Sequence, residues 1–181
     1  MKLKIADKLI SDDSPAFIVA ELSANHLKDY DLAIKTIKAM KASGADAVKV
    51  QTYTADTLTI DCDNEYFKIN NGSIWDGQTF YDLYKSAYMP WEWQAELKKL
   101  AEDLGLIFFS TPTDKTSVDF LEKLEVPAYK ITSFEITDIP LIEYVASKGK
   151  PVILSTGIAD INYIKDAVNA CKNQGNEQIA I

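Results

Sequence analysis

Apolar and polar positions along the chain predict short buried strands, each followed by an amphipathic helix. Apolar runs of strand length cover residues 16–22, 47–53, 106–112, 128–134, 151–157 and 178–181. Apolar residues recur with helical spacing over residues 29–44, 91–105, 115–125, 139–149 and 161–175. Strict alternation of strands and helices with short connections predicts a parallel sheet with helices outside it.

This order of elements fits either a doubly wound open sheet or a (β/α)8 barrel. The chain has no G-x-G-x-x-G or P-loop motif, which weakens the nucleotide-binding form of the open sheet. A complete barrel takes roughly 250 residues, whereas this chain has 181 residues and ends in its sixth predicted strand. We therefore expect an α/β fold of the TIM-barrel type, an incomplete barrel in which residues 1–181 supply about strands one to six.

The connection after the second predicted strand, residues 54–90, is too long for an ordinary strand-to-helix loop. It is rich in aromatic residues, and it lies on the side of the sheet where function concentrates. Its stretch "TFYDLYKSAY" at 79–88 predicts a short helix whose aromatic side chains pack on the barrel. The segment is equally a candidate lid or pocket wall, and the two interpretations are compatible.

Two lysines, Lys49 and Lys130, each lie between apolar residues in the middle of a predicted strand, where a charge is costly. Because side chains alternate along a strand, both lysines share the face opposite to their apolar neighbours, which in a barrel is the lumen. The same parity turns these polar residues inward near the strand ends: Glu21, Gln51, Tyr53, Thr111, Thr132 and Ser155. Barrel enzymes keep their active sites at that end.

Two ammonium groups, with hydroxyl groups from Thr111, Ser133 and Ser155, match a dianionic phosphate. The structural alternative is an ion pair in the lumen between Glu21 and one lysine, but one carboxylate does not balance two lysines. A buried lysine without a partner loses its proton or acquires an anion. Gln51, beside the lysines, is either a metal ligand or an ordinary hydrogen-bonding residue.

The composition limits the classes of partner. The formal net charge is −8, so binding to nucleic acid or to an anionic membrane surface is not expected. The two cysteines lack metal-ligand spacing, so we interpret them as free thiols of a reducing compartment. The sequence has no targeting segment and no apolar run of membrane-spanning length, so we expect a cytoplasmic protein. The one histidine, His26, is typical of a hydrogen-bonding loop residue, and neither a Ser–His–Asp triad nor a zinc site is available.

Five motifs resemble, in order and spacing, the successive strand ends of the sialic acid synthase family. They are "AELSANH" (20–26), "GADAVKVQTY" (44–53), "FFSTP" (108–112), "YKITSFEITDIPLI" (129–142) and "VILSTGIA" (152–159). The stretch "WDGQTFYDLYKSAYMPWEW" (75–93) is more similar to the pseudaminic acid branch than to the N-acetylneuraminate branch. The resemblance runs from about residue 16 to the end of the chain. Taken together, these motifs are highly specific.

The resemblance implies a (β/α)8 barrel, usually followed by a small antifreeze-like domain. It also implies the condensation of phosphoenolpyruvate with an open-chain acetamido sugar and the release of phosphate. In the pseudaminic branch that sugar is 2,4-diacetamido-2,4,6-trideoxy-L-altrose. The usual cofactor is a divalent metal, Mn²⁺ or Mg²⁺. The family's two metal-binding histidines belong to later strands, beyond Ile181, so we expect the fragment to be inactive alone and the rest of the barrel and the C-terminal domain to be absent.

Carried over motif by motif, the resemblance assigns roles to individual residues. Contacts to phosphoenolpyruvate would come from Lys49, Thr111, Lys130, Ser133 and Ser155. The catalytic residues would be Glu21, Lys49, Lys130 and Glu135. The metal ligand would be Gln51, and the sugar side would include Asn25, His26 and Tyr53. The sequence departs from the family pattern at Thr113, where an aromatic residue is common, and at Thr132, where alanine is common.

Three other functions stay open. A class I aldolase would form a Schiff base on Lys130 or Lys49. The chain could also belong to the N-acetylneuraminate branch, or be a non-catalytic half-barrel that binds phosphorylated ligands. An open barrel has unpaired strands at both edges, so we also expect a homodimer or larger assembly.

Overall fold

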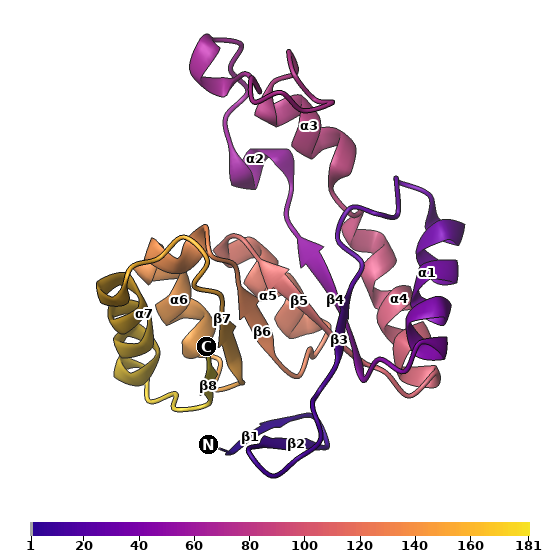
Figure 1. Ribbon diagram of the computed structural model, residues 1–181, viewed down its shortest axis with the longest axis vertical. Helices are drawn as coiled ribbons and strands as arrows, with labels where there is room; N and C mark the ends of the chain where they lie inside the picture. Colours follow the sequence, from indigo (N-terminus) through magenta and orange to yellow (C-terminus); the bar gives the residue numbers. More distant parts are fainter. Residues whose placement is uncertain (1) are drawn as a thin grey trace.

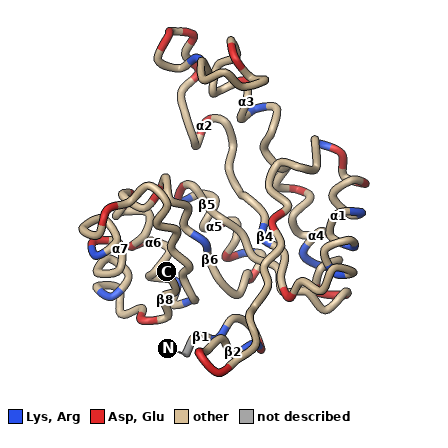
Figure 2. Tube along the Cα trace, in the orientation of Figure 1, with Lys and Arg blue, Asp and Glu red and all other residues tan. Residues whose placement is uncertain are grey.

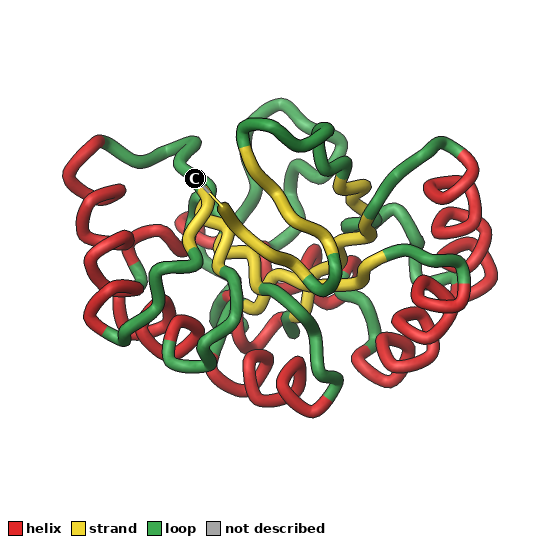
Figure 3. Tube along the Cα trace, turned by 90° about the horizontal axis from the view of Figure 1, so that it is seen from below, coloured by secondary structure: helices red, strands yellow, loops and turns green. Residues whose placement is uncertain are grey.

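The computed structural model describes residues 2–181, and its centre is one curved sheet of six parallel strands. The strands are β3 (Val19–Glu21), β4 (Ala47–Thr52), β5 (Ile107–Pro112), β6 (Tyr129–Ile131), β7 (Val152–Leu154) and β8 (Ile179–Ala180). They are neighbours in the order of the sequence. Figure 3 shows the sheet curled like a trough, with the helices along its outer side. The expected incomplete (β/α)8 barrel is confirmed.

Five helices follow the strands, close to their predicted places (Figure 1). They are α1 (Tyr30–Ala42), α4 (Trp91–Asp103), α5 (Lys115–Lys123), α6 (Ile139–Ala146) and α7 (Ile161–Asn173). An aspartate precedes four of them and accepts hydrogen bonds from backbone N–H groups of the first turn, which satisfies donors that the helix leaves free. After α1 and α4, Gly44 and Gly105 take φ angles of 87° and 71°, which let the chain turn at once toward the next strand.

The alternation of side chains in β4 agrees with the predicted parity. Val48 and Val50 are fully buried on the face that packs against the helices, whereas Lys49 and Gln51 lie on the concave face. The helix-facing side also holds a buried polar contact, in which the hydroxyl oxygens of Thr52 and Ser110 lie 2.6 Å apart. Thus the lysine of this strand is on the side that the sequence predicts.

An antiparallel hairpin at the start of the chain was not predicted. Its strands are β1 (Lys2–Ile5) and β2 (Lys8–Ser11), and they lie at the end of the sheet where the parallel strands begin (Figure 1). Leu3 and Ile5 are buried in the main hydrophobic core. The hairpin therefore covers the lower end of the half-barrel and leaves the carboxyl ends of the strands open.

Residues 54–90 form a lobe that projects beyond the carboxyl end of β4 (Figure 1). The lobe contains α2 (Ala55–Leu58), a short 3₁₀ helix at Glu65–Phe67, and α3 (Phe80–Ala87), the last of which was predicted. Lys28, in the loop before α1, donates a hydrogen bond to the Lys85 carbonyl at 2.7 Å and lies 3.9 Å from the Tyr88 ring centroid. These contacts tie the lobe to the loop after β3.

Several strands are shorter than the apolar runs suggest. β3, β6 and β7 have three residues each, and residues 132–134 leave the sheet in a turn rather than extending β6. Among residues 2–181, no helix combines the length and the apolar character needed to cross a bilayer. Figure 2 shows acidic and basic residues spread over the outer helices, while some charges lie along the strands themselves.

Candidate active site

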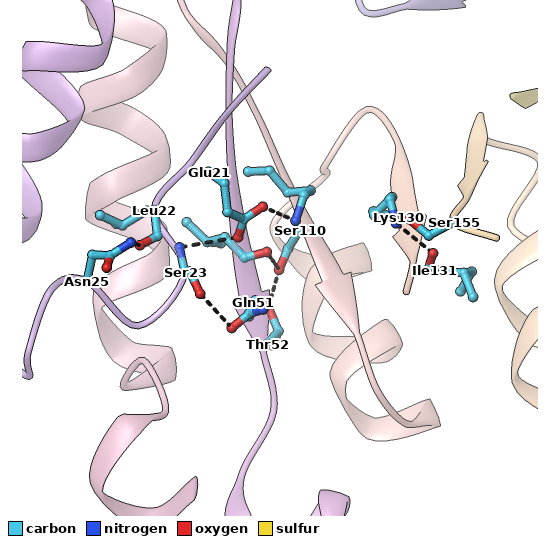
Figure 4. A network of polar contacts seen from close by, with 12 residues as sticks. Glu21, Leu22, Ser23, Asn25, Gln51, Thr52, Ser110, Lys130, Ile131 and Ser155 are labelled. Carbon is cyan, nitrogen blue, oxygen red and sulfur yellow. Dashed lines mark hydrogen bonds and ion pairs between the residues drawn. The ribbon is translucent and has the colours of Figure 1, made fainter. Parts of the chain in front are cut away.

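The first part of the candidate site is an ion pair between neighbouring strands. In the register of β3 and β4, Glu21 lies opposite Lys49, and the Lys49 Nζ contacts a Glu21 carboxylate oxygen. The Glu21 side chain is 35% exposed and the Lys49 side chain is 17% exposed. The Ser23 N–H donates to the same carboxylate at 3.2 Å (Figure 4). The lumen ion pair considered from the sequence is therefore present, and it involves Lys49.

Lys130, the second lysine, has a different environment. Its Nζ donates to the Ser155 hydroxyl and, at 2.8 Å, to the Ile131 carbonyl (Figure 4). Burial, together with the nearby charge of Lys49, lowers the pKa of Lys130 to about 8, while Glu21 and Glu135 act in the opposite direction. The two ammonium groups are thus close enough to repel each other, on one face of the sheet. An anion placed between them would relieve that repulsion.

The other predicted phosphate contacts lie on the strands around Lys130. Gln51 pairs with Thr111 in the sheet, and since Ser110 pairs with Tyr129, Thr111 comes next to Lys130. The Thr111 hydroxyl is buried and has no hydrogen-bond partner among residues 2–181. A buried hydroxyl without a partner is costly, which makes it a candidate ligand contact.

Ser133, the remaining predicted phosphate contact, lies in the turn after β6. Its hydroxyl oxygen is 3.4 Å from the position that a Cβ on Gly157 would occupy. Ser133 therefore lies beside the loop that follows β7, on the same edge of the sheet as Ser155. The predicted set thus occupies adjoining strand ends, although only Lys130 and Ser155 are in direct contact.

A pocket of about 360 Å³ opens at the carboxyl ends of β4, β5 and β6. It is lined by Gln51, Tyr53, Leu58, Tyr84, Thr111, Thr113, Thr132, Phe134 and Glu135. Four of these residues were predicted site residues: Gln51, Tyr53, Thr111 and Glu135. Leu58 and Tyr84 come from the lobe, which therefore supplies part of the pocket wall. The volume is within the range of small-molecule sites.

Glu135 is the ionisable carboxyl of this pocket. Burial raises its pKa, the charge of Asp138 adds to the rise, and Lys130 opposes it. The Thr132 hydroxyl donates to its carboxylate. Burial also raises the pKa of Tyr53 to about 12, so this tyrosine keeps its proton at neutral pH. A carboxyl group with a raised pKa in a pocket is suited to general acid–base work.

Asn25 and His26, predicted on the sugar side, hold the loop after β3 and are not among the residues that line the pocket. The Asn25 side chain donates to the Leu22 carbonyl at 3.0 Å. His26 is fully buried, accepts from the Lys28 N–H at 3.0 Å through Nδ1, and meets the edge of Trp93. Burial lowers the pKa of His26. Contact of Asn25 and His26 with a sugar stays a prediction.

Gln51 is the predicted metal ligand. Its side chain lines the pocket, and its carbonyl oxygen accepts a long hydrogen bond of 3.5 Å from the Ser23 hydroxyl. A neutral carboxamide oxygen suits a hard divalent cation as one ligand among several. Within the described chain, no group of three or more His, Cys, Asp or Glu residues could hold a metal. Of the described residues, Gln51 could therefore supply one ligand of a metal site, but not a complete set.

Five residues of the pocket were not predicted as site residues from the sequence, apart from a general interpretation of residues 54–90 as a wall. They are Leu58, Tyr84, Thr113, Thr132 and Phe134. The aromatic composition of the long connection indicates Tyr84, and the departures from the family pattern indicate Thr113 and Thr132. No sequence signal identifies Leu58 or Phe134, because their place depends on how the lobe and the turn after β6 fold.

The comparison with protein families decides the assignment, since the model of the NeuB family matches residues 36–181. The chain belongs to the NeuB family. Among its curated relatives is the pseudaminic acid synthase of Helicobacter pylori, 46% identical over 167 residues, which are 92% of this chain and 49% of that protein. The pseudaminic acid synthase of one Campylobacter jejuni strain is 47% identical over 147 residues, 81% of this chain and 43% of that protein. The chain thus spans about half the length of these NeuB relatives.

Solved structures agree with the NeuB assignment. The N-acetylneuraminic acid synthetase of Leptospira borgpetersenii, in complex with citrate, superposes with a TM-score of 0.85 at 27% identity, over 99% of this chain and 57% of that chain. The Bacillus subtilis spore coat polysaccharide biosynthesis protein SpsE gives a TM-score of 0.80 at 34% identity, over 99% of this chain and 46% of that chain. The predicted resemblance to the sialic acid synthase family is confirmed.

Proposed function

We propose that this chain forms part of a synthase that joins phosphoenolpyruvate to 2,4-diacetamido-2,4,6-trideoxy-L-altrose, giving a nonulosonic acid and phosphate. The observation that carries the proposal is the position of Lys49 and Lys130, whose charges interact on one concave face at the strand ends. The similarity to two pseudaminic acid synthases supports this choice of sugar. A legionaminic acid synthase of Legionella pneumophila is 40% identical over 86% of this chain and 44% of that protein, so its diacetamido sugar is the nearest competitor.

In this proposal the two lysines hold the phosphate of phosphoenolpyruvate. The dianion would stabilise the charged form of Lys130, and Ser155, already in contact with it, would donate to a phosphate oxygen. The buried hydroxyl of Thr111 gains the partner that it lacks. The same contacts stabilise the phosphate as it leaves, because its negative charge stays between the same donors.

The covalent steps follow from the chemistry of an enol phosphate. The double-bond electrons form a bond from C3 to the aldehyde carbon, and the aldehyde oxygen takes a proton, for which Glu135, whose pKa burial raises, is the nearby candidate donor. Water adds to the cationic C2, and one of its protons returns to Glu135. The bond between C2 and the phosphate oxygen then breaks, its electrons leave with the phosphate, and the proton of the C2 hydroxyl passes to that phosphate, which gives a ketone and hydrogen phosphate.

A divalent metal, when bound, would polarise the aldehyde oxygen as a Lewis acid. Gln51 would supply one oxygen ligand, and the remaining ligands would have to come from groups other than those described. Catalysis that is lost on chelation and restored by Mn²⁺ or Mg²⁺ would support this part of the proposal. Assembly as a homodimer and a cytoplasmic location stay predictions, which sedimentation and cell fractionation would test.

A second candidate function is a class I aldolase, and one observation favours it. The pKa of Lys130, lowered to about 8, gives a larger share of free amine at neutral pH than an ordinary lysine has. Its Nζ would then attack a ketone and lose water to give an imine. Treatment with pyruvate and borohydride would leave a stable adduct on Lys130 if this were the mechanism.

The deciding experiment measures phosphate release by the full-length protein that the gene encodes. Phosphoenolpyruvate is supplied with the diacetamido-trideoxy-altrose, with its legionaminic-type isomer, or with N-acetylmannosamine, each with and without chelator. We expect metal-dependent release with the first sugar. Release with none of the three sugars, or turnover that chelation leaves unchanged while borohydride traps pyruvate, would reject the proposal.

A further inference from the structure

The lobe brings one side chain with a hydroxyl group to the pocket at the strand ends. Tyr84, in α3, lines this pocket of about 360 Å³ together with Glu135, which begins the 3₁₀ turn after β6. Leu58, the other lobe residue in the lining, is apolar. Among the residues that the structure describes, Tyr84 is therefore the lobe's hydrogen-bonding side chain in this pocket.

The ring of Tyr84 is held by aromatic neighbours, and its hydroxyl takes no part in this packing. The ring lies edge-on to Tyr53, with centroids 6.1 Å apart, and stacks on Phe80 at 6.2 Å. The hydroxyl forms no hydrogen bond within the described part of the chain. By contrast, the hydroxyl of Tyr81, in the same helix, donates to Asp56 at 3.1 Å and joins α3 to α2. The fold thus uses the ring of Tyr84 and leaves its hydroxyl available.

Glu135 is the charged group close to this hydroxyl. Burial, together with the negative charge of Glu135, raises the pKa of Tyr84, so the two side chains are close enough to interact and the tyrosine keeps its proton at neutral pH. On Glu135 itself, burial and the charge of Asp138 raise the pKa, and Lys130 lowers it. A protonated phenol beside a carboxyl group can donate a hydrogen bond to the ionised form of that group.

The proposed reaction leaves a negative charge on Glu135. Once Glu135 has given its proton to the aldehyde oxygen, its carboxylate remains half-buried in the pocket. Within residues 2–181, the Thr132 hydroxyl is the one side-chain donor that contacts this carboxylate. Because each added donor stabilises a carboxylate that has lost water, a second donor would make the proton transfer more favourable.

We infer that Tyr84 is a positioning residue that acts through Glu135: its hydroxyl donates to the carboxylate that remains when Glu135 has given up its proton. This inference rests on the proposed function, in which Glu135 is the candidate proton donor. It gives the lobe a part in the chemistry, because α3 has to lie over the strand ends to bring Tyr84 to this pocket. A hydrogen bond to the ionised form also holds the pKa of Glu135 lower than it would be without Tyr84.

The test is Tyr84→Phe in the full-length protein, which keeps the ring and its two aromatic contacts and removes only the hydroxyl. Carbon NMR of protein labelled at its glutamate carboxyl groups measures the pKa of Glu135, whose signal is assigned by its loss in Glu135→Gln. The pKa should be about one pH unit higher in Tyr84→Phe, as expected for losing a hydrogen bond to a charged group. The kcat of phosphate release should fall up to about tenfold, while the KM for phosphoenolpyruvate stays within about twofold.

Tyr81→Phe is the matched control, because it removes a hydroxyl from the same helix at a position outside the pocket lining. It should leave the pKa of Glu135 and the kcat unchanged. Equal Glu135 pKa values in the wild-type protein and in Tyr84→Phe, or an equal rise in Tyr81→Phe, would overturn the inference while the synthase proposal stands. Absence of phosphate release by the wild-type protein with every sugar would instead reject the proposed function, and the role of Tyr84 with it.

Discussion

Replacing Lys130 by methionine is expected to make the fold more stable at neutral pH while abolishing binding of phosphoenolpyruvate. Burial, together with the charge of Lys49, lowers the pKa of Lys130 from 10.5 to about 8. A shift of this size corresponds to roughly 3 kcal/mol. Because the side chain is only partly buried, solvent screening reduces the usable figure to roughly 1–2 kcal/mol. Methionine keeps the apolar stem of the lysine and removes the charge.

The sign of the effect depends on pH. Between pH 8 and 10.5 the unfolded chain keeps the proton on Lys130 and the folded chain releases it. The unfolded state therefore binds more protons in this window, so the stability of the wild-type protein rises with pH there. The advantage of Lys130→Met is thus complete below pH 8 and disappears above about pH 10.5.

Thermal unfolding at pH 7 and pH 10.5 measures this difference. We expect Lys130→Met to raise the Tm by about 2–6 °C at pH 7, and by little at pH 10.5. The matched control is Lys49→Met, which leaves Glu21 without its partner and should lower the Tm. Phosphoenolpyruvate should raise the Tm of the wild-type protein but not that of Lys130→Met. A Lys130→Met protein less stable than the wild type at pH 7 would refute the reasoning.

Three further predictions concern the same region and its supports. If phosphate binding needs the charged form of Lys130, affinity for phosphoenolpyruvate falls roughly tenfold per pH unit above pH 8. Calorimetric titration should show this slope in the wild-type protein. The variant Lys130→Arg should not show it, because its guanidinium stays charged. Asp114→Ala removes the N-cap of α5 and should cost about 1–2 kcal/mol in urea unfolding at pH 7, with Asp114→Asn as the control. Burial opposes the fall in the pKa of Asp114, but hydrogen bonds from Thr116 and Ser117 lower it, so the cost should shrink as acid protonates the carboxylate; an unchanged cost would contradict this assignment. Lys28→Met should speed amide hydrogen exchange in α3 without changing exchange in α4; equal exchange in α3 would show that Lys28 does not hold the lobe.

The order of strands and helices could be predicted because local rules and tertiary packing agree along this part of the chain. In β4, the face toward the helices must be apolar, so the alternating pattern places Lys49 on the opposite, concave face. Aspartate before a helix and glycine after it place the boundaries within about two residues. Strand ends are less certain, since residues 132–134 have strand-like composition but turn away after β6.

The hairpin and the pocket wall could not be predicted in the same way. The turn between β1 and β2 has Ala6 at a φ of 51° and contains neither glycine nor asparagine, so the usual hairpin signal is missing. Leu58 and Phe134 line the same pocket only once the lobe and the turn after β6 have folded. No periodic pattern encodes this arrangement, which brings segments more than seventy residues apart in the sequence to one pocket.

The environments of the two lysines explain how the ion pair and the phosphate site can coexist. Glu21 offsets the charge of Lys49, so the pair places little net charge in the lumen. Lys130 has no such carboxylate in contact within residues 2–181, and its lowered pKa shows that burial is not fully compensated. Lys130 therefore brings a positive charge that no carboxylate of residues 2–181 contacts directly, beside a serine and a buried threonine hydroxyl. An apolar residue at this position would cost the fold less, so the presence of a half-buried Lys130 is best explained by an anion that binds there.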